Sequence, residues 1–125
     1  MIHLDANVLI LLPRLTADNH PLIQRLRGDE EVAVSSIAWF EYLCGPVIER
    51  DLPLTRIGVD GRILDVDQGI AERAALLFNG CGRKRALRTD CLIAATALLA
   101  EAELATFNAS DFKPFTDYGL KLLPL

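Results

Sequence analysis

The chain begins Met1-Ile-His-Leu-Asp5-Ala-Asn7-Val-Leu-Ile-Leu-Leu12. The residues before Asp5 are typical of a short buried strand, and the apolar run after Asn7 is typical of the first turns of a helix. Asp5 and Asn7 therefore lie at a strand-to-helix junction. In open parallel α/β sheets, ligands bind outside the carboxyl ends of the strands, so a carboxylate at this junction faces the expected binding crevice.

The same alternation of strands and helices continues along the chain. Further strands are predicted at residues 32–34, 62–66, 104–106 and 120–123. Helices are predicted at residues 8–12, 21–26, 37–43, 68–78 and 91–101, with Ser35 and Asp67 as N-cap signals and Pro13 as a break after the first. Residues 47–61 have no clean period and could form a helix, a loop or both. The pattern predicts an α/β fold with helices on both faces of a parallel sheet.

Composition limits the classes of protein that the chain can represent. Its 125 residues are enough for one domain, and 51% of them are hydrophobic. That content favours a sheet covered on both faces or an apolar surface reserved for a partner. The net charge of -4 argues against binding nucleic acid by bulk electrostatics, although it leaves room for an acidic metal pocket with a basic rim.

The cysteines and the apolar runs indicate the compartment. Cys44, Cys81 and Cys91 are odd in number and have no C-x-x-C spacing, which argues against a disulfide framework or a zinc site. The first residues have no basic segment of the signal-peptide kind, and the longest uncharged apolar run, residues 91–100, is too short to span a bilayer. We expect a cytoplasmic protein.

Four acidic residues are candidates for a common site: Asp5, Glu41, Asp90 and Asp111. Glu41 lies one turn into the helix after the second strand, and the other three are tied to expected strand ends or helix starts. Asp5 and Asp111 follow strands, and Asp90 opens the helix before the fourth strand. A doubly wound sheet would place these three at one edge. Hard divalent cations such as Mg²⁺ or Mn²⁺ bind oxygen ligands of this kind, so the four acids are a candidate metal site.

Each acid also has an ordinary structural explanation. Asp5 could cap the following helix, and cap and ligand are equally good interpretations of its spacing. Asp90 suits the first turn of any helix, and Asp111 with Asn108 resembles a capping box. Glu41 lies beyond the first turn and makes no cap, so its alternative is a solvated helix face. The metal hypothesis rests on the four acids taken together.

Other side chains carry weaker signals. The basic run at residues 83–88 is more often a solvated loop than a binding patch, but it could steer a phosphate backbone toward Asp90. The aromatic residues among positions 39–42 are typical of a core or a partner-binding face, with base stacking a weaker interpretation. His3 and His20 are interpreted as structural.

Four blocks of residues, in this order and spacing, resemble the PIN-domain ribonucleases. They are Leu4-Asp5-Ala-Asn7-Val-Leu9, Ser36 with Glu41 and Gly45, Asp90-Cys-Leu-Ile-Ala-Ala-Thr-Ala97, and Thr106-Phe-Asn108-Ala-Ser-Asp111-Phe112. Any one block is a weak signal, and the four together are a strong one. Within the family, the short length is most similar to the VapC-type toxins of type II toxin–antitoxin pairs.

The resemblance implies one PIN-like nuclease domain over residues 1–125, with a twisted parallel sheet of about five strands, and a metal-dependent endoribonuclease activity. It implies that Asp5, Glu41, Asp90 and Asp111 are catalytic and hold Mg²⁺ or Mn²⁺, with Asn7, Thr106 and Asn108 in support. Ala6 departs from the family, which often has Thr there, and so removes a hydroxyl near the metal.

The resemblance also implies partners. They are an RNA substrate, whose phosphates Arg85 or Arg88 would contact, a cognate antitoxin that covers the site, and a second copy of the chain in a homodimer. The helices expected over residues 11–26 and 37–47 would offer the groove for the antitoxin.

Two other functions remain open at this stage. Asp5-x-Asn7 after a first strand resembles the nucleophilic loop of haloacid-dehalogenase-type phosphatases, but Asn7 replaces the second acid and no Lys follows a strand end at the expected place. The chain could instead be a non-catalytic module, either signal-receiver-like or a PIN fold that only binds RNA or protein. The intact set of four acids argues against lost activity.

Overall fold

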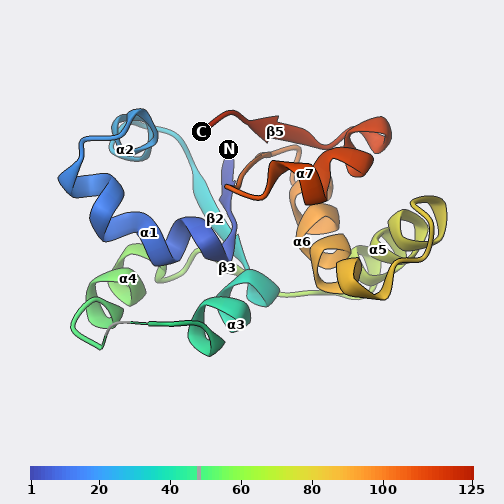
Figure 1. Ribbon diagram of the computed structural model, residues 1–125, viewed down its shortest axis with the longest axis horizontal. Helices are drawn as coiled ribbons and strands as arrows, with labels where there is room; N and C mark the ends of the chain where they lie inside the picture. Colours follow the sequence, from blue (N-terminus) through green and yellow to red (C-terminus); the bar gives the residue numbers. More distant parts are fainter. Residues whose placement is uncertain (48) are drawn as a thin grey trace.

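The centre of the molecule is a five-stranded parallel sheet with the strand order β3-β2-β1-β4-β5 (Figure 1). The computed structural model describes residues 1–47 and 49–125. The strands are β1 (Ile2–Leu4), β2 (Val32–Ser35), β3 (Ile63–Leu64), β4 (Glu103–Ala105) and β5 (Lys121–Leu123). The predicted α/β fold with about five parallel strands is confirmed.

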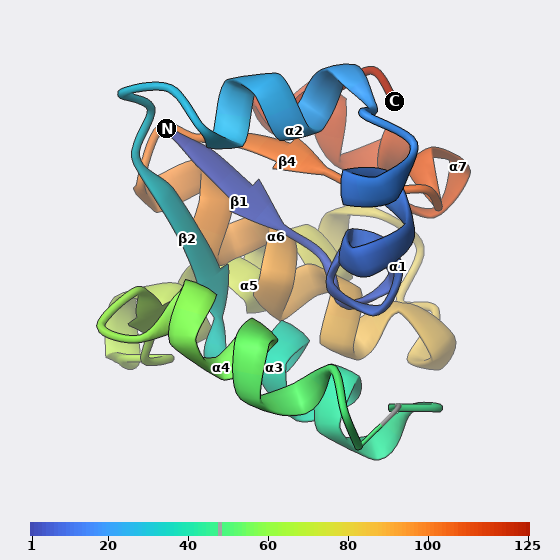
Figure 2. The same ribbon diagram turned by 90° about the vertical axis from the view of Figure 1, so that its left-hand side faces the viewer.

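Helices cover both faces of this sheet. The α-helices are α1 (Ala6–Ala17), α2 (Pro21–Leu26), α3 (Ser36–Cys44), α4 (Leu52–Val59), α5 (Gln68–Gly80), α6 (Arg88–Leu99) and α7 (Ala109–Phe112). Two 3₁₀ helices, η1 (Arg85–Leu87) and η2 (Lys113–Tyr118), complete the elements. Helices α1, α2 and α4 lie in front of the sheet in Figure 2, and α5 and α6 lie behind it.

The central strand β1 is buried on both faces. Ile2, His3 and Leu4 are at most 2% exposed. Leu4 lines a groove with residues of α1, α2 and α4, and because side chains alternate along a strand, His3 points to the opposite face. Its ring nitrogens have no hydrogen-bond partner among the described residues, and burial followed by the nearby N-terminal amine lowers the pKa of His3 to about 4.

Local capping explains where several helices begin. Ser35 Oγ accepts a hydrogen bond from the Ile37 N–H at 3.1 Å, and Asp67 Oδ1 accepts one from the Ile70 N–H at 2.8 Å. Both N-cap predictions are therefore confirmed. His20 has a structural role, as predicted, because its Nδ1 accepts a hydrogen bond from the Leu22 N–H at the start of α2.

Some predicted boundaries are wrong. Helix α1 does not end at Pro13 but continues to Ala17, and the buried Leu15 anchors its last turn against the core. Strand β3 has two residues instead of the predicted five, because it is an edge strand that pairs only with β2. Within the ambiguous residues 47–61, α4 forms and buries Thr55 and Val59, and residue 48 lies outside the described residues.

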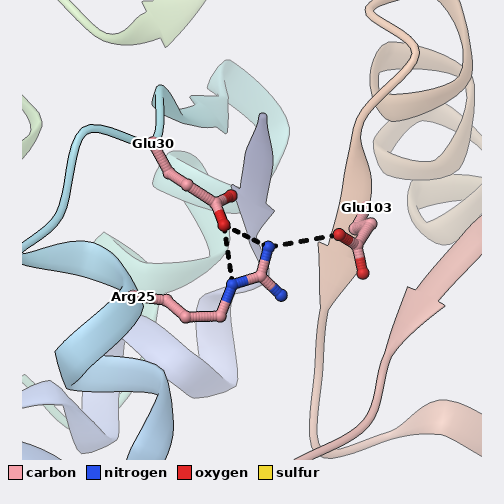
Figure 3. A network of polar contacts seen from close by, with 3 residues as sticks. All are labelled: Arg25, Glu30 and Glu103. Atoms are coloured by element: carbon pink, nitrogen blue, oxygen red, sulfur yellow. Dashed lines mark hydrogen bonds and ion pairs between the residues drawn. The ribbon is translucent and has the colours of Figure 1, made fainter.

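The amino edge of the sheet contains a compact ion-pair network (Figure 3). Arg25 of α2 lies between Glu30, which precedes β2, and Glu103, which begins β4. Its guanidinium is 2.5 Å from Glu30 Oε1 and 3.2 Å from Glu103 Oε1. The network ties α2 to β4 across one face of the sheet.

None of the helices in residues 1–47 and 49–125 combines the length and the hydrophobicity needed to cross a bilayer.

Candidate active site

Asp5 lies at the carboxyl end of β1 and is 4% exposed. Its Oδ1 accepts a hydrogen bond from the Ala6 N–H at 2.8 Å, and its Oδ2 accepts one from Thr106 Oγ1 at 2.7 Å. Asn7 Nδ2 donates a longer hydrogen bond to the same Oδ2 at 3.3 Å. One oxygen therefore caps α1 while the other faces the end of β4, so the cap and ligand interpretations of Asp5 are compatible.

Hydrogen bonds join the start of α1 to the loop after β4. The Thr106 hydroxyl donates to Asp5 and accepts from Asn7 Nδ2 at 3.3 Å and from the Asn108 N–H at 3.0 Å. Asn7 Oδ1 accepts from the Phe107 N–H at 3.1 Å. The three predicted supporting residues Asn7, Thr106 and Asn108 thus share one network, to which Asn108 contributes its backbone.

The other three acids approach Asp5 from three helices. Glu41 of α3 and Asp90 in the first turn of α6 are partly buried, and Asp111 of α7 is exposed. Burial, followed by the charges of Asp5, Glu41 and Asp111, raises the pKa of Asp90 to about 7. The fold therefore brings the four predicted acids within electrostatic range of one another, around the carboxyl edge of the sheet.

The pKa of Asp5 responds to opposing effects. Burial raises it most, the hydrogen bonds from Thr106 and Ala6 lower it, and the negative charge of Asp111 raises it again. Donated hydrogen bonds stabilise the charged carboxylate, whereas burial and a like charge disfavour it. The hydrogen bonds from Thr106 and Ala6 therefore offset only part of the rise in the pKa of Asp5.

The chemistry of this donor set fits a hard divalent cation. Within the described part of the chain, none of the four carboxylates forms an ion pair with Lys or Arg. No group of three or more His, Cys, Asp or Glu side chains in that part is arranged so that it could hold a metal ion. The fit is therefore one of residue type, because carboxylate oxygens are the ligands that Mg²⁺ and Mn²⁺ prefer.

The capping-box interpretation of Asp111 is wrong. The Asn108 N–H donates to Thr106 Oγ1 and not to the Asp111 carboxylate, and the Asn108 side chain makes no cap. Asp111 belongs to the short helix α7. Its carboxylate is therefore not committed to a local backbone bond.

The basic run divides into two parts. Arg83 lies over the Phe78 ring, 5.2 Å from its centroid, and donates to Asn79 Oδ1. Arg85 of η1 and Arg88 of α6 are exposed, and their side chains make no ion pair with a described residue. Arg83 thus has a structural role, whereas Arg85 and Arg88 project into solvent close to Asp90 in the chain.

The sequence interpretation missed Phe107. This residue follows Thr106, its side chain is 41% exposed, and its N–H is held by Asn7. Its only signal in the sequence was an apolar residue within a polar turn. Of the aromatic residues that the sequence singled out, Tyr42 is buried and stacks on Trp39 at 5.1 Å, which agrees with a core role, and Phe40 is 60% exposed.

Comparisons with known proteins agree with this geometry. A toxin–antitoxin complex from Klebsiella pneumoniae is 29% identical to the chain, covers 90% of both chains and gives a TM-score of 0.68. FitAcB from Neisseria gonorrhoeae is 25% identical, covers 99% of this chain and 97% of its own, and gives 0.73. VapBC-1 from nontypeable Haemophilus influenzae has the same fold, at 24% identity, coverage of 98% and 97%, and a TM-score of 0.68.

No curated protein matches the chain significantly. The family model of the PIN domain, however, matches residues 2–115, which include all four acids and the Thr106 network. Asn7, which the phosphatase alternative would place in its loop, is a hydrogen-bonding neighbour of Asp5. The match spans most of the chain, and the protein belongs to the PIN domain family.

Proposed function

We propose that this PIN domain is a metal-dependent endoribonuclease and the toxin of a type II toxin–antitoxin pair. The observation that carries the proposal is the group of four carboxylates, none of which has a basic partner among the described residues. Burial, followed by the charges of Asp5, Glu41 and Asp111, raises the pKa of Asp90 to about 7, and strongly shifted pKa values cluster at functional sites. Membership of the PIN family supports the same reaction class.

The site residues would have different roles in hydrolysis. Asp5, Glu41, Asp90 and Asp111 would hold Mg²⁺ or Mn²⁺, and such a cation, when bound, supplies Lewis acidity at the scissile phosphate. Thr106 and Asn7 fix Oδ2 of Asp5 by hydrogen bonds, so this carboxylate is already ordered. Pre-ordered groups lose less conformational freedom when the substrate binds.

Cation binding should depend on the protonation state of Asp90. Because its pKa is about 7, roughly half of the Asp90 carboxyls carry a proton near neutral pH. A cation binds the deprotonated form, so binding releases that proton and strengthens as the pH rises. Cleavage should therefore increase from pH 6 to pH 8.

Arg85 and Arg88 would bind the RNA backbone. Both are exposed and lie at or just before the start of α6, near Asp90 in the chain. Phosphate contacts position a nucleic acid without reading its sequence. A protein of net charge -4 needs local positive charge at the site, because its overall charge repels RNA.

Two apolar grooves support an antitoxin as a partner. One, of about 660 Å³, lies between α1, α2 and α4, and its wall includes Leu54 and Ile57, which are 73% and 74% exposed. The other, of about 410 Å³, lies between α1 and the residues from Tyr42 to Val47. Both grooves are lined by residues of the helices expected over residues 11–26, and the second groove is also lined by residues within 37–47. The contribution of α4 to the first groove was not expected.

A partner that covers these apolar walls removes them from water, and this burial favours binding. The similar structure from Klebsiella pneumoniae is a toxin–antitoxin complex, so we propose that an apolar segment of a cognate antitoxin fills these grooves. The homodimer implied by the resemblance remains part of the proposal, and exposed apolar residues such as Phe40 and Leu43 on α3 are compatible with it.

The proposal is tested by RNA cleavage with the purified chain. Labelled transfer, ribosomal and messenger RNA are incubated separately in Mg²⁺, in Mn²⁺ and in EDTA. We expect internal cleavage with either cation and none in EDTA. Asp90→Asn should lower the rate at least about a hundredfold, since it removes a charged ligand from the reacting centre.

Asp29→Asn is the matched control, because Asp29 is an exposed acid in a loop away from the four carboxylates. It should cleave like the native chain. Absence of cleavage from all three RNA classes, or full activity of Asp90→Asn, would overturn the nuclease proposal. RNA binding without cleavage would instead favour the non-catalytic binding module.

A further inference from the structure

Asp111 lies on the four-residue helix α7, which has little stability of its own. Asn108 makes no side-chain cap for this helix, and Asp111 is exposed. One turn of helix fixes several dihedral angles for each hydrogen bond that it forms, so a helix this short is held by its surroundings. The place of the Asp111 carboxylate therefore depends on how residues 109–118, which form α7 and η2, are attached to the molecule.

Two phenylalanines attach the inner side of this segment. Phe112 and Phe115 are at most 1% exposed, belong to the hydrophobic core, and contact each other edge to face with ring centroids 6.1 Å apart. The segment continues beyond them to Tyr118, which is 44% exposed. Burial in the core thus accounts for the two phenylalanines but not for the position of Tyr118.

The Tyr118 ring lies on Gly80, at the C-terminal end of α5. A Cβ atom added at Gly80 would lie 2.8 Å from Tyr118 Cζ and 3.3 Å from Cε1, and closer still to the hydroxyl oxygen. The ring therefore fills the space that a side chain at position 80 would need. One residue later, the Cys81 thiol donates to the Pro114 carbonyl oxygen at 3.8 Å. Both contacts join η2 to the end of α5.

Gly80 is explained by this contact and not by its backbone. It is the last residue of α5, and its φ is not positive. Alanine stabilises a helical position more than glycine does. The chain thus has the less favourable residue for the helix at the position where the Tyr118 ring needs room.

The same end of α5 leads to Asp90. It is followed by η1 and by α6, which lies beside α5 and carries Asp90 in its first turn (Figure 1). Asp111 lies within electrostatic range of Asp90. The contact between Tyr118 and Gly80 therefore links the segment that carries Asp111 to the pair of helices that carries Asp90.

We propose that Tyr118 is a positioning residue, whose ring on Gly80 holds residues 109–118 against α5 and so keeps the Asp111 carboxylate at the candidate metal site. This inference rests on the proposed metal-dependent function and adds a residue that acts on the cation only through Asp111. Removal of a contact that orients a metal ligand typically lowers metal affinity about tenfold or more.

The first measurement is hydrogen exchange of residues 109–113 in EDTA, which needs no cation. Tyr118→Ala should speed exchange there, because the segment opens locally more often. Gly80→Ala should do the same, because its methyl group displaces the ring. Tyr118→Phe keeps the ring that lies on Gly80 and should restore the native exchange.

The second measurement is the affinity of the metal-free chain for Mn²⁺ by titration calorimetry. Tyr118→Ala and Gly80→Ala should each weaken binding about tenfold, and Tyr118→Phe should restore it. The double variant should bind no more weakly than either single variant, because both changes remove one contact. Leu76→Ala truncates an apolar residue 62% exposed on α5, and as the matched control it should alter neither exchange nor affinity.

The Asp111→Asn chain tests whether Tyr118 acts through Asp111. In that chain Tyr118→Ala should cause no further loss of Mn²⁺ affinity, since the ligand that it positions is already removed. A further loss of about tenfold would overturn the inference, because Tyr118 would then support the fold in general. Faster exchange in Tyr118→Ala with native Mn²⁺ affinity would overturn it as well.

The outcomes distinguish this inference from the proposed function. If the native chain binds Mn²⁺ and cleaves RNA but Tyr118→Ala matches it in both measurements, the inference fails and the nuclease proposal stands. If Mn²⁺ binds with the expected losses but the native chain cleaves no RNA, the nuclease proposal fails alone. Absence of Mn²⁺ binding by the native chain would overturn both, because Asp111 would have no cation to hold.

Discussion

Acidic residues lie at both the amino edge and the carboxyl edge of the sheet, but their ion pairing differs. At the amino edge, Arg25 lies between Glu30 and Glu103 and pairs with both (Figure 3). At the carboxyl edge, four acids lie within electrostatic range of one another, and no Lys or Arg of the described residues is paired to any of them. The same chain thus pairs the acids of its amino edge with a guanidinium and leaves the acids of the candidate site without such a partner among the described residues.

This difference has an energetic meaning. Two unit charges about 4 Å apart interact by roughly 4 kcal/mol at an effective dielectric of about 20. At Asp90, burial first and then the charges of Asp5, Glu41 and Asp111 raise the pKa of the carboxyl to about 7. At the amino edge the acids instead raise the pKa of Arg25, with Glu30 the larger cause. The carboxyl edge is therefore strained until a cation or a proton arrives.

The largest expected effect is stabilisation by metal. With Mn²⁺ or Mg²⁺ at about a thousandfold excess over Kd, the native chain should gain about 4 kcal/mol in its free energy of unfolding. Asp90→Asn should melt higher than the native chain in EDTA, because it removes one repelling charge, and should gain less from the cation. Thermal melting in EDTA and in each cation measures both effects.

Glu103→Gln is the control at the other edge. It weakens the Arg25 network but leaves the four carboxyl-edge acids intact, so its metal-induced rise in Tm should equal that of the native chain. Equal rises for Asp90→Asn and the native chain would show that the acids do not form one site.

A smaller effect is expected on the pH dependence of stability in EDTA. The pKa of Asp90 is about 7 in the folded state and 3.8 for a free aspartate side chain, so the folded state binds its proton more tightly and stability should rise as the pH falls from 7 toward 4. The pKa of His3 falls from 6.5 to about 4, so this group should lower stability by at most roughly 3 kcal/mol between pH 6.5 and 4.

Single substitutions separate these opposing contributions. Asp90→Asn should remove the Asp90 part of the gain on acidification and keep the part due to the raised pKa of Asp5, whereas His3→Leu should remove the loss due to His3. Denaturant unfolding of each variant at pH 7.5, 6 and 5 measures the slopes. The explanation fails if both variants keep the native pH profile.

The smallest expected effect belongs to the amino edge. Arg25→Met should lower Tm by less than either effect above, because the Arg25 and Glu103 side chains are each 36% exposed and surface ion pairs contribute little. The difference from the native chain should shrink in 1 M NaCl, which screens the pairs. Metal-induced stabilisation and RNA cleavage should not change, and loss of either would mean that the two edges are coupled.

Much of the fold was predictable because its signals are local. Caps such as Ser35 and Asp67 act within three residues of themselves, and the alternation of strands and helices is visible in short windows. The continuation of α1 past Pro13 was not predictable in this way, because it depends on tertiary burial of Leu15. Helix α4 likewise became clear only from the burial of its inner face.

The four acids of the site were predictable from the sequence, whereas the hydrogen bonds that orient them were less so. Strand order alone places Asp5 near the end of β4, but the hydrogen bond from Thr106 spans 101 positions and depends on the register of β1 against β4. The exposure of Phe107 could not be predicted, because an apolar residue type does not reveal whether its side chain finds a place in the core. Local residue patterns do not determine which positions distant in the sequence come into contact.

The pairing of β1 with β4 has a consequence for how the protein is synthesised. Residues 2–4 are translated first but find their partners Glu103, Leu104 and Ala105 only after about four-fifths of the chain exists. A nascent chain that stops before β4 carries Asp5, Glu41 and Asp90 but lacks the Thr106 hydroxyl and Asp111. Contacts of such high sequence separation form late in folding. The four acids can therefore come together around the end of β1 only when synthesis is nearly complete.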